Sequence, residues 1–398
     1  MNRWKQTRLD EFIDFNPRES IPKGKLVKKI AMDKIEPYTR DIDEYELLEF
    51  KGGTKFKNGD TLMARITPSL ENGKTAKVNL LDDDEIGFGS TEFIVARAKA
   101  GISDADFIYY TLSRPDIREI AIKSMAGSSG RQRVQLDVLK NYEVHLPDLI
   151  EQQKIAEILK VLDDKIENNR KINHHLSVIV QAIFNSWFVD YVPFGGTLPS
   201  EWKEVDFDEI STVQNGYAFK SKDYVSDGVR MIRTTNFDNG YVNNNDLIML
   251  PSEFYNDAKY RNFVLKKFDT VLVMVGASVG KISLITELNT PALQNQNMWR
   301  FRSIIPEIPE SFIHFNVKRI NDQVRGWSSG SARDFYRKDI FKKAKVYLPT
   351  SQVLDDFSKI TMPIFEQISN NILENDKLIK ARDSLLPKLM SGEVSVTD

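Results

Sequence analysis

Residue types that could support catalysis are few, and they do not form a recognised arrangement. No H-E-x-x-H pair occurs among the four histidines, which are His145, His174, His175 and His314. His174-His175 is expected on the exposed side of a helix, as a solvated pair. Gly276–Lys281 resembles a phosphate-binding loop, but one residue is missing between its glycines, and Ile282 replaces the hydroxyl that would hold magnesium. We interpret this stretch as a tight turn between strands, so the sequence predicts neither a metal site nor a nucleotide site here.

Spaced carboxylates also fail as a catalytic centre. Asp148 followed by Asp163-Asp164-Lys165 mimics a nuclease pattern, but these residues fall on one predicted helix, where they cannot converge on one metal ion. There is no Asn-Pro-Pro-Tyr segment to grip an extruded adenine, because Asn16-Pro17 is followed by Arg18-Glu19. Nor is there a glycine-rich loop suited to a methyl-donor cofactor. We therefore expect the chain to catalyse nothing alone and to bind no cofactor.

Basic side chains cluster twice around a Ser-Ser-Gly loop. Residues 318–345 contain nine Lys or Arg against three Asp, and residues 114–140 contain six Lys or Arg against three carboxylates. Backbone amides of such a loop suit a phosphate, and flanking arginines suit a phosphate or guanine. One cluster could be an ordinary solvated face, but two at equivalent places favour contact with double-stranded DNA. The predicted DNA-binding residues are Lys74, Ser128, Ser129, Arg131, Arg133, Arg233, Asn236, Lys281, Ser328, Ser329, Arg333 and Arg337.

A polar run at 294–297 has two interpretations that the sequence leaves open. These side chains, with Arg233 and residues 234–236, could read adenine edges or simply cap strands.

Two long helices are predicted to position these loops. Residues 147–192 and 350–392 carry apolar side chains at a spacing of about 3.5 residues, which is typical of a helix packed along its length on another helix. Asn169 and Asn173 interrupt the first seam, and polar seam residues fix register. Pro363 is expected to kink or restart the second helix. The predicted packing residues are Ile155, Leu159, Leu162, Ile166, Asn169, Asn173, Leu176, Ile183, Trp187, Phe357, Ile368, Ile372 and Leu385.

An internal repeat organises the remainder. DTLMARI (60–66), EFIVARA (92–98) and VHLP (144–147) recur in order as DTVLVMV (269–275), NMWRFRS (297–303) and VYLP (346–349). We predict an α+β protein with similar mixed α/β domains at 1–146 and 193–349. Two antiparallel helices at 147–192 and 350–392 would form a coiled-coil spacer with near two-fold symmetry. A helix of roughly 40 residues would be about 60 Å long, which is between one and two turns of duplex DNA.

Composition sets wider bounds. The chain has 398 residues, a net charge of −2 and no cysteine. It therefore has no disulfides or thiolate sites, and we expect a cytoplasmic protein without a membrane span. The near-neutral charge means that any basic footprint must be local.

The order of parts resembles the specificity subunit of type I restriction–modification enzymes. The closest segments are LPDLIEQQKIAEILKVLDDKIENNRKIN (146–173), NSWFVDYVPF (185–194) and the tail RDSLLPKLMSGEV (382–394). The openings SEWKEVDFDEI (200–210) and GYAFKSKDY (216–224) also resemble the start of a recognition domain. The resemblance covers essentially the whole chain, and the helix segments are its most specific part.

The resemblance implies that each globular domain is a target recognition domain for half of a split DNA site. The helices would set the gap between half-sites and dock two methyltransferase subunits, which would use S-adenosylmethionine to methylate adenine. A further restriction and translocase subunit would use ATP and Mg²⁺ to move along and cut unmethylated DNA. The rival interpretations are a self-contained methyltransferase or nuclease, and a coiled-coil protein adaptor that does not bind DNA.

Overall fold

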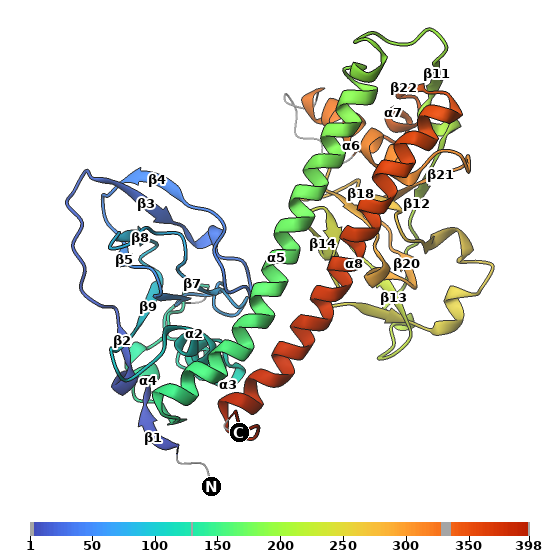
Figure 1. The fold of residues 1–398 in the computed structure, drawn as a ribbon. Coiled ribbons are helices and arrows are strands. Elements are labelled where there is room, and N and C mark those ends of the chain that lie inside the picture. Colours follow the sequence, from blue (N-terminus) through green and yellow to red (C-terminus); the bar gives the residue numbers. More distant parts are fainter. Residues whose placement is uncertain (1–3, 129, 328–335, 397–398) are drawn as a thin grey trace. The chain divides into compact units, whose positions relative to one another are not determined.

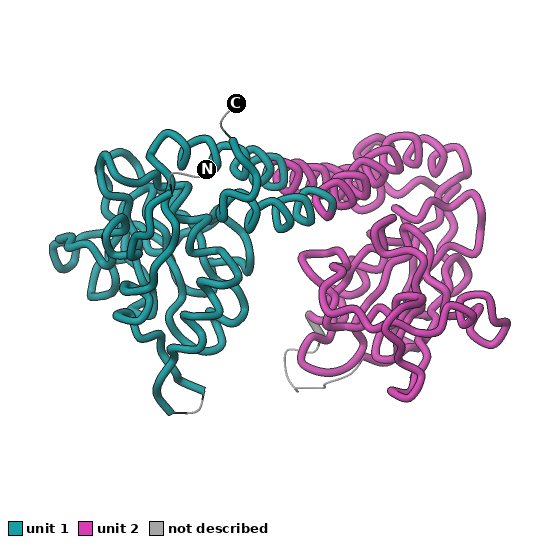
Figure 2. The backbone as a smooth tube through the Cα atoms, turned by 90° about the horizontal axis from the view of Figure 1, so that it is seen from below, with its two compact units in different colours: residues 1–167, 377–398 teal, residues 168–376 magenta. Residues whose placement is uncertain are grey.

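The computed structural model describes residues 4–128, 130–327 and 336–396. The chain forms two compact units, coloured separately in Figure 2: unit 1 is residues 1–167 with 377–398, and unit 2 is residues 168–376. Each unit contains a globular part and a portion of two helices, α5 (Leu149–Phe188) and α8 (Ser351–Met390). The long helices are thus divided between the units.

Three sheets build the globular part of unit 1 (Figure 1). The first has the order β2-β9-β6-β7 and is antiparallel throughout: Ile13–Phe15, Phe93–Ala98, Thr61–Ala64 and Thr75–Lys77. The second has the order β4-β3-β8-β5, with β3 and β8 parallel: Glu46–Glu49, Leu26–Ile30, Gly87–Gly89 and Thr54–Phe56. Strand β1 (Lys5–Arg8) pairs with β10 (Glu143–Leu146) and so joins the two ends of the globular part.

Unit 2 repeats this plan and extends its first sheet by the strands β15 and β14. That sheet has the order β12-β21-β18-β19-β15-β14: Ser211–Asn215, Met298–Ser303, Thr270–Val273, Ile282–Leu284, Tyr241–Val242 and Phe237–Asp238. The second sheet has the order β16-β13-β20-β17, with β13 and β20 parallel: Ile248–Leu250, Val229–Ile232, Ala292–Gln294 and Val264–Leu265. Strands β11 (Lys203–Asp206) and β22 (Lys345–Leu348) pair as β1 and β10 do. The predicted repeat and fold class are confirmed.

A buried ion pair is reproduced in both units. The carboxylate of Asp60 accepts two hydrogen bonds of 2.7 Å from the guanidinium of Arg97, and Asp269 accepts bonds of 2.6 and 2.5 Å from Arg302. Each aspartate is 1 % exposed, and each also accepts the backbone N–H three residues earlier. Two-point pairing of this kind fixes geometry as well as charge. It therefore holds the strands β6 and β9, or β18 and β21, in the same register.

The helices of the globular parts differ at one proline. Unit 1 has α2 (Ala105–Ser113) and α3 (Pro115–Lys123), whereas unit 2 has the single helix α6 (Glu310–Trp327). Arg114 between α2 and α3 is extended in ψ, at 138°, because a residue before proline is excluded from the helical region. The described residues also form three shorter α-helices: α1 (Leu9–Phe12), α4 (Leu136–Lys140) and α7 (Lys338–Lys342).

The seam between α5 and α8 is filled within each unit. In unit 1, Ile155 and Leu159 of α5 and Leu386, Leu389 and Met390 of α8 share one core with α2. In unit 2, Val180 and Phe184 of α5 and Leu354, Phe357 and Phe365 of α8 share a core with α6. Helix α8 runs through Pro363 without a break, so the predicted restart there is wrong. Among the described residues, no helix has the length and apolar character required to cross a bilayer.

Candidate nucleic-acid interface

A short ribbon at residues 126–133 is the most defined part of the predicted interface in unit 1. Ala126 and Arg133 exchange backbone hydrogen bonds of 3.0 and 2.9 Å. The other edge of the ribbon is bound to the segment after β6, because Thr67 N–H donates to Gln132 and Val134 N–H donates to Arg65. Gly127 has φ 137°, and a Cβ there would lie 3.0 Å from the Arg131 carbonyl, so glycine is needed at this turn.

The side chains on this ribbon are not equivalent. Ser128 and Arg131 are exposed, and the Arg131 guanidinium has no hydrogen-bond or ion-pair partner among the described residues. Arg133 instead pairs with Glu92, at 2.7 Å between Nη2 and Oε1. The Arg133 hydrogen bond lowers the pKa of Glu92 below its ordinary value, and Glu92 raises the pKa of Arg133. Both groups are therefore charged at neutral pH. Ser129 lies outside the described residues.

Lys74 occupies a different kind of position. Its ammonium donates a 2.8 Å hydrogen bond to the carbonyl of Met32, and the side chain is half-buried. This bond connects the loop between β6 and β7 to the segment that contains Met32. Lys74 thus serves an internal contact in this conformation.

In unit 2 the corresponding loop joins β18 to β19. Gly276–Lys281 forms a tight hairpin turn between these antiparallel strands, as predicted, and Lys281 is exposed. A Cβ at Gly280 would lie 2.6 Å from the Tyr336 hydroxyl, so the turn packs closely on the segment leading to α7. Arg337 is exposed at the N-cap of α7. Ser328, Ser329 and Arg333 lie outside the described residues.

Two predicted readers in unit 2 are internal. Asn236 is 1 % exposed; its Oδ1 accepts from the Arg233 backbone N–H, and its Nδ2 donates to the Asn245 carbonyl. The prediction for Asn236 is therefore corrected: it caps a turn and presents no polar group to a base. Arg233 is half-buried, and its guanidinium donates to the Asp246 carbonyl. Gln294 is fully buried and bonds the carbonyls of Gln214 and Met298, which favours the strand-capping interpretation for this residue.

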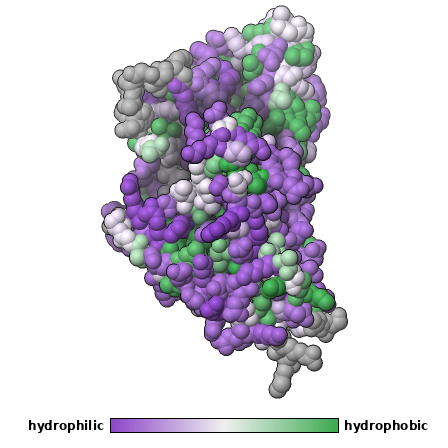
Figure 3. All heavy atoms as spheres, turned by 90° about the vertical axis from the view of Figure 1, so that its left-hand side faces the viewer, coloured by the Kyte–Doolittle hydropathy of each residue, from purple (hydrophilic) through white to green (hydrophobic). Residues whose placement is uncertain are grey.

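Several basic side chains of the two clusters are paired with carboxylates. Asp206 of β11 pairs with Lys343 and Lys345, each at 2.8 Å, and Asp208 pairs with Lys342 at 3.5 Å. In unit 1, Arg114 pairs with Asp116 and Lys123 with Glu119. Part of the charge counted along the sequence is therefore paired with carboxylates, while Arg131 and Arg337 are exposed. The face in Figure 3 is mostly hydrophilic, with apolar side chains in small separate groups.

The predicted seam residues include a polar ladder in unit 2. Asn169 Nδ2 donates to Asn375 Oδ1 at 2.9 Å, and Asn371 Nδ2 donates to Asn173 Oδ1 at 2.8 Å. The partners Asn371 and Asn375 were not predicted. They are four residues apart in α8, as Asn169 and Asn173 are in α5, and this spacing places both side chains on one face of a helix. The pairing of 169 with 375 and of 173 with 371 is antiparallel. The apolar seam positions Ile166, Phe357 and Ile368 are buried, and the half-buried ones are Leu162, Leu176, Ile183, Trp187, Ile372 and Leu385.

Unit 1 holds its helices with a buried polar cluster. Asp163 of α5 is 5 % exposed and accepts hydrogen bonds from the Tyr110 hydroxyl (2.7 Å) and from Arg382 of α8 (2.8 Å). Burial and Asp163 together raise the pKa of Tyr110, so its hydroxyl remains a donor. Burial would lower the pKa of Arg382, but Asp163 and Asp383 outweigh it, and the guanidinium stays charged.

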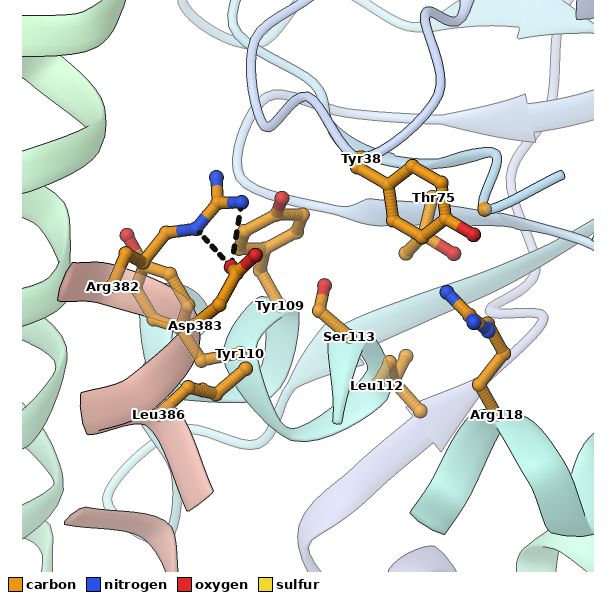
Figure 4. A pocket seen from close by; sticks show the side chains of 11 residues that line it. Tyr38, Thr75, Tyr109, Tyr110, Leu112, Ser113, Arg118, Arg382, Asp383 and Leu386 are labelled. Carbon is orange, nitrogen blue, oxygen red and sulfur yellow. Dashed lines mark hydrogen bonds and ion pairs between the residues drawn. The ribbon is translucent and has the colours of Figure 1, made fainter. Parts of the chain in front are cut away.

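A small pocket of about 60 Å³ lies beside this cluster. Figure 4 shows Arg382 and Asp383 on one side of it, with Tyr38 and Arg118 on the other. The Arg118 guanidinium lies 4.9 Å from the centre of the Tyr38 ring. Cofactor sites are usually about 300–1,000 Å³, so this pocket is a gap in the helix-docking region rather than a substrate site. Among the described residues no group of His, Asp and Glu side chains could hold a metal ion.

Comparison with known proteins gives consistent matches over most of the chain. The family model described as the type I restriction modification DNA specificity domain matches residues 1–177 and 199–381. The HindI specificity subunit of Haemophilus influenzae is 26 % identical, over 85 % of this chain and 87 % of that protein. The MjaVIII specificity subunit of Methanocaldococcus jannaschii is 23 % identical, over 78 % and 75 % respectively. A crystal structure of the type I S subunit from M. genitalium shares the fold, with a TM-score of 0.57, 17 % identity, and coverage of 98 % and 96 %.

Proposed function

This chain belongs to the family of type I restriction–modification DNA specificity proteins, and from that premise we propose how its two units divide one task. It serves as the DNA specificity subunit of a type I restriction–modification system and is itself non-catalytic. Unit 1 reads one half of a two-part DNA site, and unit 2 reads the other half.

The observation that supports this division is the repeat. Both units share the order of their central strands, the Asp–Arg pair between equivalent strands, and a family match in each half. A duplicated domain with different loop residues can bind two different DNA sequences with one backbone plan. The exposed predicted residues on these loops are Ser128, Arg131 and Arg133 in unit 1, and Lys281 and Arg337 in unit 2.

The outer faces of α5 are proposed to dock methyltransferase subunits. Exposed apolar side chains outside the seam include Ile158 and Val161 in unit 1 and Val178 and Ile179 in unit 2. Val161 is 56 % exposed and Val178 is 54 % exposed, and each has a second exposed apolar side chain close to it on the helix, Ile158 and Ile179 respectively. Val161→Glu should weaken capture of the methyltransferase subunit. The control Gln153→Glu places the same charge at another exposed position of α5, and equal loss in both variants would contradict docking at Val161.

The chemistry is assigned to the partners. The methyltransferase subunits would bind S-adenosylmethionine and methylate adenine, and a restriction and translocase subunit would use ATP and Mg²⁺. The helices α5 and α8 would set the length of the unread gap between half-sites.

Reconstitution with the methyltransferase subunits tests the proposal. The complex should bind genomic fragments selectively, and mapping of methylated adenines should return a motif of two short sequences separated by a fixed gap. Absence of DNA binding by the complete complex would favour the protein-adaptor interpretation. Methylation or cleavage by the purified chain alone would show instead that it is an enzyme.

A further inference from the structure

Arg133 is bound by Glu92 along only one side of its guanidinium. Nε donates to Glu92 Oε2 at 2.9 Å, and Nη2 donates to Oε1 at 2.7 Å. A guanidinium has five N–H donors in a rigid plane, and this side-on pairing uses two of them. The edge formed by Nη1 and the second hydrogen of Nη2 has no protein acceptor among the described residues.

The backbone that carries this pair is fixed from both sides. Arg133 forms bridges to Ala126 within the ribbon and to Ile66 beyond it. Glu92 immediately precedes β9, and its carbonyl accepts the Arg65 N–H at 2.9 Å. The Arg133 side chain is 45 % exposed and that of Glu92 is 22 % exposed. An exposed arginine held this way loses little conformational freedom on binding a ligand.

The pair selects between the two DNA groups that an arginine can bind. A phosphate carries a full negative charge, and the adjacent Glu92 carboxylate would repel it. The major-groove edge of guanine is neutral and offers two acceptors, N7 and O6, at the spacing of the free guanidinium edge. Arg131, in the same ribbon and without a partner in the described part of the chain, has the character expected for a phosphate contact.

We propose that Arg133, positioned by Glu92, reads one guanine in the half-site recognised by unit 1. This inference rests on the proposed function and adds the base and the positioning residue. The equivalent of Glu92 in unit 2 is Asn297, because both residues immediately precede the matching strands β9 and β21. Asn297 has no charge, so the carboxylate that orients Arg133 has no counterpart at this position of unit 2.

The test compares variants in the reconstituted complex with the methyltransferase subunits. Methylation motifs and binding to a randomised half-site library would be measured for wild type, Arg133→Ala and Glu92→Gln. Both variants should lose preference for the same guanine, by roughly ten-fold to one-hundred-fold for Arg133→Ala, with the other half-site unchanged. Asp116→Asn is the matched control, because Asp116 pairs side-on with Arg114 in the same unit (3.0 and 2.6 Å), and its motif should match wild type.

Salt dependence separates base contact from phosphate contact. Arg131→Ala should reduce the slope of log affinity against log salt by about one, and Arg133→Ala should leave it unchanged. A reduced slope for Arg133→Ala with an unchanged motif would overturn the inference. So would a Glu92→Gln motif identical to wild type in a complex that still modifies DNA specifically. If the wild-type complex recognised no sequence at all, the proposed function would fail, and this inference with it.

Discussion

The two units dock the same pair of helices with opposite chemistry. Asp163 in α5 and Phe365 in α8 occupy equivalent positions, counted from the helix starts at Leu149 and Ser351. Asp163 bonds Tyr110 in unit 1, whereas Phe365 contacts Phe315, with ring centres 6.2 Å apart, in unit 2. Tyr110 and Phe315 occupy equivalent places in α2 and α6. The repeat therefore conserves position and shape while exchanging a charged cluster for an aromatic one.

The third residue of each cluster also occupies an equivalent position with a different chemical character. Arg382 in α8 and Val180 in α5 are also equivalent when each is counted from the start of its helix. Arg382 supplies the cation for Asp163, and Val180 is fully buried in the aromatic core of unit 2. A buried ion pair offsets the desolvation of its charges, whereas an aromatic core gains directly from burial. Unit 1 should therefore be more sensitive to loss of one partner, and unit 2 more tolerant of conservative exchange.

The largest loss of stability is expected from Arg382→Ala, in unit 1. Asp163 would stay buried without its cation, and loss of one partner of a buried pair costs about 3–5 kcal/mol. Hydrogen exchange of peptides from α2 and β6 would report the loss in unit 1. The double variant Asp163→Leu with Arg382→Met should recover most of it, because apolar replacement of both partners is near neutral. A cost below about 1 kcal/mol for the single variant would remove the distinction between the units.

Unit 2 is also expected to respond to pH through two opposed groups. Burial raises the pKa of Glu310 to about 7, and burial, with Lys318 nearby, lowers the pKa of His314 to about 3. The raised Glu310 stabilises unit 2 at low pH, and this contribution is lost as pH rises through 7. The depressed His314 acts in reverse, because its contribution is present above 6.5 and is lost as pH falls towards 3. Between pH 6.5 and 5 the two contributions nearly cancel, at about 2 kcal/mol each.

Glu310→Gln should leave the histidine contribution unopposed. The stability of unit 2 should then fall by about 2 kcal/mol from pH 6.5 to 5, while wild type changes little. Hydrogen exchange of β18 and β21 peptides would measure it, with β6 and β9 as the internal comparison. The equivalent positions in unit 1 are Ala105 and Tyr109, neither of which titrates in this range. A Glu310→Gln variant as insensitive to pH as wild type would contradict the opposed pair.

A smaller effect is expected from the asparagine ladder. Asn371→Ala would leave Asn173 Oδ1 without its 2.8 Å donor in a buried seam, at a cost of about 1–2 kcal/mol. Exchange of α5 and α8 peptides around these residues would measure it. Leucine at both positions should restore stability but weaken the preference for one register, as polar seam residues specify register. If the double variant kept the same preference for one register as wild type, the asparagine ladder would not set the alignment of α5 with α8.

The smallest effect is expected from Phe365→Leu, at about 1 kcal/mol. Leucine keeps most of the buried volume and loses the ring contacts to Phe268 and Phe315, at 5.7 and 6.2 Å. The matched change in unit 1, Asp163→Asn, keeps shape and loses the charge that faces Arg382. Urea unfolding followed by hydrogen exchange in each unit would compare them. If Asp163→Asn lowered the free energy of unfolding no more than Phe365→Leu does, the contrast between the two clusters would be wrong.

Much of the architecture was predictable because it depends on local patterns. The spacing of Ile155, Leu159 and Ile166 predicts a packed helix face, and apolar runs such as residues 61–64 and 93–98 predict buried strands. Repetition of these runs in order predicts two similar domains. The sheets with very short strands, such as β5 and β8, give no comparable signal.

The electrostatic features were not predictable, because their partners are distant in sequence. Lys343 and Lys345 both form ion pairs with the one carboxylate of Asp206, which is distant in sequence but lies in the strand paired with β22. Glu92 is also distant from Arg133 along the chain, and its hydrogen bond fixes the orientation of the Arg133 guanidinium. An asparagine side chain has the donor and acceptor needed to read a base edge, so residue type alone favours that role for Asn236. Its burial shows instead that it caps a turn. Local charge counts therefore do not show which side chains in a segment are free to bind a ligand.

The central claim is that two recognition units are spaced by the paired helices, and a matched insertion tests it most directly. One helical turn would be inserted between Glu167 and Asn168 in α5 and between Asp376 and Lys377 in α8, the borders between the units. The inserted turn of about four residues adds about 6 Å, close to two base pairs of duplex. Methylation mapping of the reconstituted complex should return both half-sites unchanged, with a gap longer by about one or two base pairs. Altered half-sites with an unaltered gap would contradict the account.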